Sequence, residues 1–208
     1  MDSEGKSIDN LAKLVPRNEY HIFNKAIGTD KLFISEKDYF FFLQKLDRFI
    51  LPVADIFSYC LIPNHFHLLV KIKDFDILPP KIQQEKNHPT ELLLSKVFSN
   101  FFNSYTKSYN LAHDRQGRLF LYPFKRIIVE DDGYMIYLIN YIHRNPIHHG
   151  ITGSFSSWKY SSYNAILSKR PTNINRDFVL SVFNDKEEFI AFHQENKIKP
   201  GMDKYLFE

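Results

Sequence analysis

The chain has 208 residues, of which 44% are hydrophobic, and its 27 basic and 24 acidic residues give a formal net charge of +3. This length and composition predict one domain with short appendages and a substantial core. The single cysteine, Cys60, excludes an intrachain disulfide and a cysteine-based zinc cluster, which suits a reducing cytosol. No apolar run approaches the ~20 residues of a membrane span, and the N-terminus lacks the order of a signal peptide, so we expect a cytoplasmic protein without membrane contact.

The first half of the chain predicts a strand, a helix and two further strands. A polar segment, residues 1–17, is expected to be a flexible arm before the first strand. Apolar residues at a 3.6-residue period predict the helix, with Ser35 as its N-cap and Pro52 at its end. Pro63-Asn64 predicts a tight connection between the second and third strands. We expect the strands at residues 19–24, 55–61 and 65–72, and the helix at residues 36–50.

The second half predicts two more helices on either side of a fourth strand. Residues 73–90 are polar and are expected to form a loop or an insertion, and Pro123 favours an edge position or a bulge for the strand. The last helix is expected to close at Asn145-Pro146, because the residue before a proline disfavours helical geometry. The expected bounds are a helix from Thr90 to about Tyr109, a strand at residues 119–129 and a helix at residues 133–144.

The resulting order, β-α-β-β-α-β followed by a helix, predicts an α+β protein. It is the ferredoxin-like arrangement, an antiparallel sheet with helices on one face, here extended by one C-terminal helix. We assign residues 18–167 to this domain. Residues 168–208 form a C-terminal extension with a helical pattern around Glu187 to His193. Its role is not indicated by the sequence: a lid, a dimer contact and a plain extension are all open.

The third predicted strand carries the sequence His65-Phe66-His67. Side chains alternate between the two faces of a strand, so both imidazoles point the same way and Phe66 points to the other side. Two neutral imidazoles at this spacing can bind one divalent cation if another segment supplies a third ligand. The alternative is a pair of half-exposed sheet residues, which His-x-His in a strand often is.

The helix at residues 133–145 could complete such a site, because Tyr137, Tyr141 and Asn145 are four residues apart and share one face. Placed beside the sheet, the helix would bring a phenol and an amide oxygen towards the histidines. A tyrosine becomes an effective nucleophile when a metal ion polarises the phosphate that it attacks, and Asn145 can supply a neutral oxygen ligand. The alternatives are core packing for Tyr137 and an ordinary interfacial role for Tyr141.

A basic, aromatic-rich segment lies between Ser95 and Ile128, where six basic residues face a single acid, Asp114. Positive charge attracts phosphates and flat rings stack on unpaired bases, so this mixture suits single-stranded nucleic acid. The alternative is a helix with buried aromatics and solvated lysines. The candidate DNA-binding residues are Lys107, Arg115, Arg118, Lys125 and Arg126, with Lys96 as the sixth basic residue.

Several motifs occur in an order that resembles the single-tyrosine HUH transposase superfamily, in particular the REP-associated tyrosine transposases. The likeness covers about residues 18–167. The motifs are Tyr20-His21-Ile22-Phe23-Asn24, the run from Tyr59 to Val70 around His65-Phe66-His67, Gly117-Arg118-Leu119-Phe120, Phe124-Lys125-Arg126, Tyr141-Ile142-His143-Arg144-Asn145-Pro146, and Trp158-Lys159-Tyr160-Ser161-Ser162-Tyr163.

The resemblance implies a metal-dependent transposase or endonuclease acting on single-stranded DNA. Such enzymes bind Mg²⁺ or Mn²⁺ through the histidine pair and recognise imperfect DNA hairpins. They cut DNA with one tyrosine, leaving a 5′-phosphotyrosine and a free 3′-hydroxyl. By position, His65 and His67 match the ligand pair, Tyr141 the nucleophile and Asn145 the polar residue that completes the metal site.

The chain departs from the family pattern where members commonly carry Trp-Gln-Gly-Arg. It has Phe120-Leu121-Tyr122-Pro123 there, so the arginine is lost or displaced to Arg118 or Arg126. The motif therefore does not indicate which residues bind the DNA hairpin. Two rival functions also remain: a non-catalytic ferredoxin-like nucleic-acid-binding protein, including a domesticated transposase, and a phosphodiesterase that uses water. The oligomeric state, monomer or homodimer, is open as well. His143, His148 and His149 follow near the end of the last helix, and we expect solvated surface histidines, with contact to phosphate as the alternative.

Overall fold

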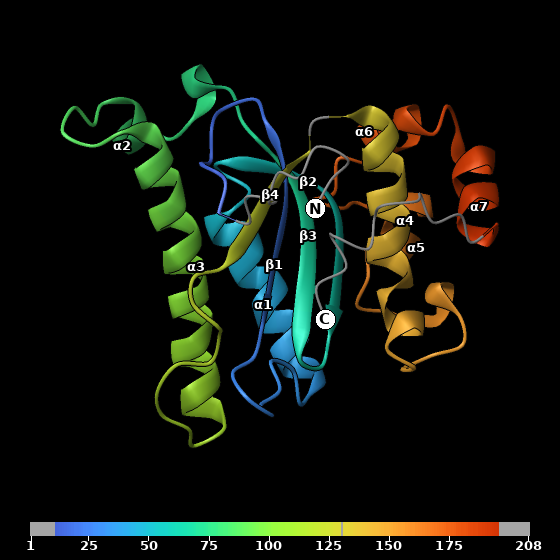
Figure 1. Cartoon of the computed structure of the whole chain (residues 1–208), viewed down its shortest axis with the longest axis horizontal. Coiled ribbons are helices and arrows are strands. Elements are labelled where there is room, and N and C mark those ends of the chain that lie inside the picture. The colour runs from blue at the N-terminus through green and yellow to red at the C-terminus, as the bar shows by residue number, and fades with distance from the viewer. Residues whose placement is uncertain (1–10, 130, 196–208) are drawn as a thin grey trace, which may run out of the picture.

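The computed structural model describes residues 11–129 and 131–195. Its centre is a four-stranded antiparallel sheet with the strand order β2-β3-β1-β4 (Figure 1). This order, with β3 inserted between two strands that a helix connects, is the predicted ferredoxin-like arrangement. The strands are β1 (Glu19–Lys25), β2 (Ala54–Ile62), β3 (His65–Ile72) and β4 (Lys125–Val129).

Helices α1 (Glu36–Phe49) and α3 (Thr90–Ala112) cover one face of the sheet, as predicted (Figure 1). Phe66 points to this face from β3, and its ring lies 5.1 Å from the Phe42 ring of α1 and 5.6 Å from the Phe102 ring of α3. The predicted cap of α1 is part of a capping box in which Asp38 accepts hydrogen bonds from Ser35. The aromatic side chains that the composition suggested for the core therefore bind both helices to the sheet.

Helix α4 (Asp132–His148) covers the opposite face, together with α5 (Tyr163–Leu167), α6 (Arg176–Val182) and α7 (Lys186–Gln194) (Figure 1). The expected end of this helix at Asn145-Pro146 is wrong, because Pro146 lies inside the last turn. The lost amide is tolerated there: the N–H groups of His149 and Gly150 bond to the carbonyls of Asn145 and Ile147, which closes the turn. The extra turn keeps Asn145 on the helix.

Residues 11–17 pack against the sheet, so the expectation of a flexible arm is wrong for this segment; residues 1–10 lie outside the described residues. Leu11 pairs with Arg126 on the outer side of β4, and the Ala12 amide donates to the Arg126 carbonyl. The buried Tyr20 hydroxyl accepts from the Val15 amide at 2.8 Å and donates to the Lys13 carbonyl at 2.6 Å. These bonds bind the segment to the end of β1.

The first part of the C-terminal extension, residues 168–195, is built into the domain. Ile174 pairs with Ile56 on the outer side of β2, and the Asn175 amide donates to the Ile56 carbonyl. Val179 in α6 and Phe189 in α7 are fully buried. The extension thus completes the layer of helices that holds α4.

Two further segments differ in detail from expectation. Residues 73–90 contain a short 3₁₀ turn, η1 (Phe75–Ile77), and one turn of helix, α2 (Pro80–Gln83), while a second 3₁₀ turn, η2 (Phe155–Ser157), follows α4. The fourth strand is shorter than predicted but lies at the sheet edge, as Pro123 indicated. None of the helices in the described residues is long and apolar enough to cross a membrane.

Candidate functional site

The two histidines of the His65-Phe66-His67 motif point to the sheet face that α4 covers. Their pairing partners on β1 and β2 are Lys25 and Ile62 for His65, and Phe23 and Cys60 for His67. Both imidazoles are buried, with 9% exposure for His65 and 1% for His67, and their ring centroids are 5.2 Å apart. The prediction that they share a face is therefore confirmed.

Tyr141 and Asn145 approach these histidines from α4. The Tyr141 ring centroid lies 5.4 Å from that of His67 in an edge-on arrangement, and Asn145 Oδ1 lies 2.9 Å from His65 Nε2. Tyr141 is 9% exposed and Asn145 is fully buried. The structure thus brings together the four residues for which the sequence predicted catalysis and metal binding.

The contact between His65 and Asn145 has unusual hydrogen-bond chemistry. His65 Nδ1 lies 3.0 Å from Oδ1 of the exposed Asn64, and a carboxamide oxygen can only accept, so with the Asn64 amide in this orientation the nitrogen carries the proton. Neutral His65 therefore presents a lone pair at Nε2, and the atom facing it, Asn145 Oδ1, also accepts. Two acceptors at this distance need a cation between them, a second proton on His65, or a turned amide: Asn145 turned so that its nitrogen donates, or Asn64 turned so that His65 carries its proton on Nε2 instead.

A second proton on His65 is disfavoured by its surroundings. Burial lowers the pKa of His65 to about 4, and His149 and Lys25 act in the same direction, while the contact with Asn145 opposes them. The imidazole is therefore neutral near pH 7. The separation of 2.9 Å is close to the ~3 Å between adjacent ligands of an octahedral ion with ~2.1 Å bonds, so these two atoms fit one divalent cation.

His67 provides a buried ring nitrogen without a partner. Its Nε2 has no hydrogen bond in the described chain, whereas its Nδ1 lies 2.8 Å from His21 Nε2 on β1. A ligand at Nε2 requires the tautomer in which His67 Nδ1–H donates to His21, and metal-bound histidines typically donate from their other ring nitrogen in this way. Burial, reinforced by the neighbouring His21 and His65, lowers the pKa of His67 well below its usual value.

The donor set is two histidines and one amide. In the part of the chain that the structure describes, no three His, Cys, Asp or Glu side chains converge to hold a metal ion by themselves. A metal ion at this place would need Asn145 as its third protein ligand, and the predicted ligand set stays a prediction. Imidazole nitrogens with a neutral oxygen suit Mn²⁺ and, less closely, Mg²⁺, which prefers oxygen throughout.

A hollow of about 520 Å³ opens beside the histidines. Its walls include His65 and His67, the cations Lys25 and Lys125, and His149, whose ring centroid lies 4.5 Å from that of His65. Lysines next to the candidate ligands suit a phosphate group. Tyr141 does not line this hollow and reaches the His67 ring from α4.

The other candidate DNA-binding residues lie away from this hollow. Arg126 donates from Nε to the Ala12 carbonyl and its guanidinium lies 4.7 Å from the Phe124 ring centroid. Arg115 pairs with Asp30 and bonds to the Arg118 carbonyl. These contacts give both arginines a role within the fold, and their predicted DNA contacts stay predictions.

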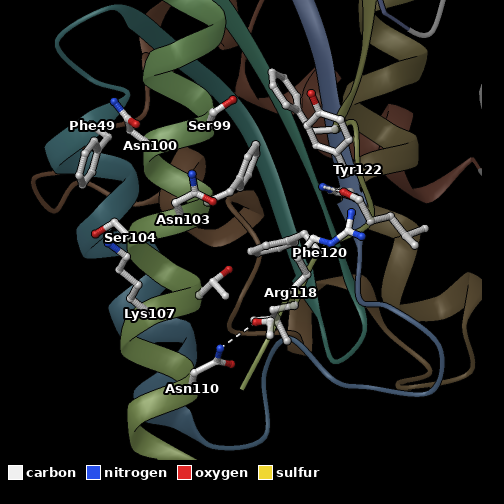
Figure 2. A pocket seen from close by; sticks show the side chains of 17 residues that line it. Phe49, Ser99, Asn100, Asn103, Ser104, Lys107, Asn110, Arg118, Phe120 and Tyr122 are labelled. Atoms are coloured by element: carbon white, nitrogen blue, oxygen red, sulfur yellow. Dashed lines mark hydrogen bonds between the residues drawn. The ribbon is translucent and has the colours of Figure 1, made fainter. Parts of the chain in front are cut away.

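Lys107 and Arg118 line a second, larger cleft of about 740 Å³ between α3 and the segment 117–124 (Figure 2). Neither side chain makes a hydrogen bond or ion pair within the described residues. The cleft shares two wall residues, Asn24 and Leu121, with the hollow beside the histidines. The two cavities are therefore neighbours.

Sequence reasoning missed two histidines. His21 contacts His67, and its position opposite β3 could have been found only from the strand register. His143 was expected at the surface but is completely buried. Its Nε2 lies 2.8 Å from Ser162 Oγ, and its Nδ1 lies 2.8 Å from Nε2 of His193 in α7.

Comparison with known proteins adds one similarity. No family model matches the chain, and no curated protein matches its sequence. A solved structure of a REP-associated tyrosine transposase bound to a REP hairpin resembles it with a TM-score of 0.55 and 14% identity, over 77% of this chain and 86% of that chain. The chain therefore has an α+β fold of the kind found in that transposase.

Proposed function

We propose that this protein cleaves and rejoins single-stranded DNA with Tyr141 as the nucleophile, aided by Mg²⁺ or Mn²⁺ held by His65, His67 and Asn145. The observation that carries the proposal is the meeting of two facing atoms, His65 Nε2 and Asn145 Oδ1, with the unpartnered His67 Nε2, beside a tyrosine and two lysines. A divalent ion bound there would polarise the phosphate and stabilise the charge that develops on it.

The residues of the chain have separate roles in this reaction. Tyr141 Oη attacks the phosphorus, the bond from phosphorus to the 3′-oxygen breaks, and the products are a 5′-phosphotyrosine and a 3′-hydroxyl that takes up a proton. The phenol proton passes to solvent. Lys25 and Lys125 bind the phosphate in the hollow, and Tyr141, which contacts the His67 ring from α4, turns towards the hollow for the attack. His21 keeps His67 in the required tautomer. Attack by the 3′-hydroxyl on the phosphotyrosine reverses these steps and rejoins a strand.

The proposed substrate is DNA with a hairpin next to single-stranded flanks. The protein of similar fold is bound to a REP hairpin, and the resemblance of the motifs points to the same class of DNA. The two rival functions are DNA binding without cleavage and hydrolysis by water. Neither of them forms a covalent protein–DNA adduct, whereas the proposed function does.

The test is a denaturing gel with labelled hairpin DNA and Mn²⁺ or Mg²⁺. We expect a covalent protein–DNA band that Tyr141→Phe abolishes. Tyr137→Phe, on the same helix one turn earlier, is the matched control and should keep the band. A band in Tyr141→Phe, or product without any covalent band, would contradict the proposed nucleophile.

Metal binding is tested apart from activity by titrating Mn²⁺ and following its electron paramagnetic resonance signal. We expect one bound ion per chain, lost in Asn145→Leu and retained in Asn145→Asp, which keeps an oxygen at the same place. Circular dichroism shows whether the variants fold. If the wild type binds no Mn²⁺, His65 and Asn145 share a direct hydrogen bond instead, and the metal site is wrong.

A further inference from the structure

Three imidazoles surround the ring of Tyr141 in the part of the chain that the structure describes. The centroid of this ring lies 5.4 Å from that of His67, 5.6 Å from that of His148 and 6.5 Å from that of His21. The proposed attack on phosphorus needs the phenol to lose its proton, because a neutral phenol is a weak nucleophile. The surroundings of the three imidazoles decide which of them can take that proton.

His67 and His21 have no free lone pair to offer. His67 is 1% exposed, and its Nε2 is the proposed ligand position. In the tautomer that leaves this atom open, His67 Nδ1–H donates to His21 Nε2 at 2.8 Å, and the other nitrogen of neutral His21 then carries a proton. His21 is also completely buried, so a charge placed on it would have no contact with water.

His148 differs from both in its surroundings. It lies in the last turn of α4, and its side chain is exposed, as expected from the sequence. The unsatisfied carbonyl groups at a helix C-terminus stabilise a nearby cation by about 0.3–1 kcal/mol, so the position favours a protonated imidazole. An exposed imidazole also exchanges its proton with water, and histidine is the side chain that changes charge near neutral pH. His148 is therefore suited to accept a proton and to release it again.

The rings of Tyr141 and His148 approach each other although the residues are two helical turns apart. Seven residues rise about 10.5 Å along a helix axis, whereas the two ring centroids are only 5.6 Å apart, with planes inclined by 30°. The two side chains therefore lean towards each other along one face of α4. At this separation the phenol can reach a nitrogen of His148 directly or through one water. Because His148 is exposed, its side chain can follow when Tyr141 turns towards the hollow.

We propose that His148 accepts the phenol proton of Tyr141 during cleavage and supplies one to the phenol oxygen during rejoining. As the Tyr141 oxygen bonds to phosphorus, its proton moves to His148. The bond from phosphorus to the 3′-oxygen breaks, its electron pair stays on that oxygen, and the oxygen takes a proton from water. His148 exchanges its proton with water between the two reactions, so the phenol proton reaches solvent through this residue.

In rejoining, the 3′-hydroxyl loses its proton to water and its oxygen bonds to phosphorus. Protonated His148 then gives its proton to the Tyr141 oxygen as the phosphotyrosine bond breaks. The inference rests on the proposed function, because it takes Tyr141 to be the nucleophile. The loss of His148 should consequently slow cleavage and rejoining by the same factor.

The test measures the rate of adduct formation on labelled hairpin DNA with Mg²⁺, a metal ion that prefers oxygen ligands to imidazole. His148→Ala should form the adduct about a hundredfold more slowly than the wild type, a typical contribution of a positioned proton acceptor. Added imidazole should restore much of the rate, whereas pyrazole, a ring of similar shape but a much weaker base, should not. His88→Ala, with 62% side-chain exposure and outside both cavities, is the matched control and should keep the wild-type rate with and without imidazole.

Mn²⁺ binding and circular dichroism of His148→Ala should match those of the wild type, which separates a lost proton acceptor from a damaged site. A wild-type rate in His148→Ala, or a loss that imidazole does not restore better than pyrazole, would overturn the proposal. In either case an adduct that depends on Tyr141 leaves the proposed function standing. If the wild type forms no adduct, both proposals fail.

Discussion

Replacing His193 with phenylalanine tests how the C-terminal extension supports the helix that carries Tyr141. His193 Nδ1 donates to the Phe189 carbonyl at 2.7 Å, so its Nε2 must accept from His143 Nδ1 at 2.8 Å. His143 Nε2 in turn accepts from Ser162 Oγ. Phenylalanine keeps the ring but leaves the His143 N–H buried without a partner.

The expected cost follows from that orphaned donor. His143 and His193 are both completely buried, and a buried donor that loses its acceptor costs about 1–3 kcal/mol. We therefore expect urea unfolding at pH 7 to show His193→Phe less stable by that amount. His88→Ala changes a side chain with 62% exposure and should stay within ~0.5 kcal/mol of the wild type.

The pH dependence gives an independent check. Burial lowers the pKa of His193 to about 4, below the ~6.5 of an unfolded histidine. The unfolded chain then binds the proton more readily, so the stability that neutral His193 contributes is full above pH ~6.5 and falls as the pH drops towards 4. By pH 5 the wild type has lost about 2 kcal/mol of its free energy of unfolding through this effect. His193→Phe has no imidazole at this position and does not show this loss.

The difference in free energy of unfolding between the wild type and His193→Phe should therefore become smaller as the pH falls from 7 to 5. Equal stability of the two proteins at pH 7 would refute the hydrogen-bond argument. A gap that stays constant down to pH 5 would refute the assigned protonation of His193.

Two further predictions concern residues with internal contacts. Arg115→Ala should lower stability by about 1 kcal/mol in urea unfolding, because its guanidinium pairs with Asp30 on a partly exposed surface, and should reduce DNA affinity less than Lys107→Ala does. A larger loss of DNA affinity in Arg115→Ala would show that Arg115 contacts DNA. The Cys60 thiol is fully buried, and burial raises its pKa, so it should react with Ellman's reagent only after unfolding. Rapid reaction in the native protein would mean that β2 opens locally.

The sheet and the metal-ligand candidates could be predicted because they depend on local periodicity. Alternation along one strand is enough to place His65 and His67 on one face, and a four-residue spacing is enough to align Tyr141 with Asn145. The meeting of these pairs follows from the β-α-β-β-α-β order, which leaves few ways to place the last helix.

Features that depend on distant partners were not predictable. Nothing in the sequence around His143 distinguishes it from a histidine at the surface. It is buried because α7, which carries His193, and Ser162 contact its imidazole. Arg115 looked like a phosphate ligand because Asp30, its partner, is far away in sequence. Helix α6 is too short for a clear periodicity, and the helical pattern at residues 187–193, where α7 lies, did not indicate that this helix packs against the domain.

Both edges of the sheet have consequences for assembly. On the outer side of β4 the Arg126 carbonyl already accepts from Ala12, and on the outer side of β2 the Leu61 and Ser162 amides bond to the carbonyls of Tyr160 and Tyr59. A second copy of the chain would have to displace these segments before its strands could pair with either edge. If two copies associate, we therefore expect contact through helices and side chains, with each four-stranded sheet remaining separate.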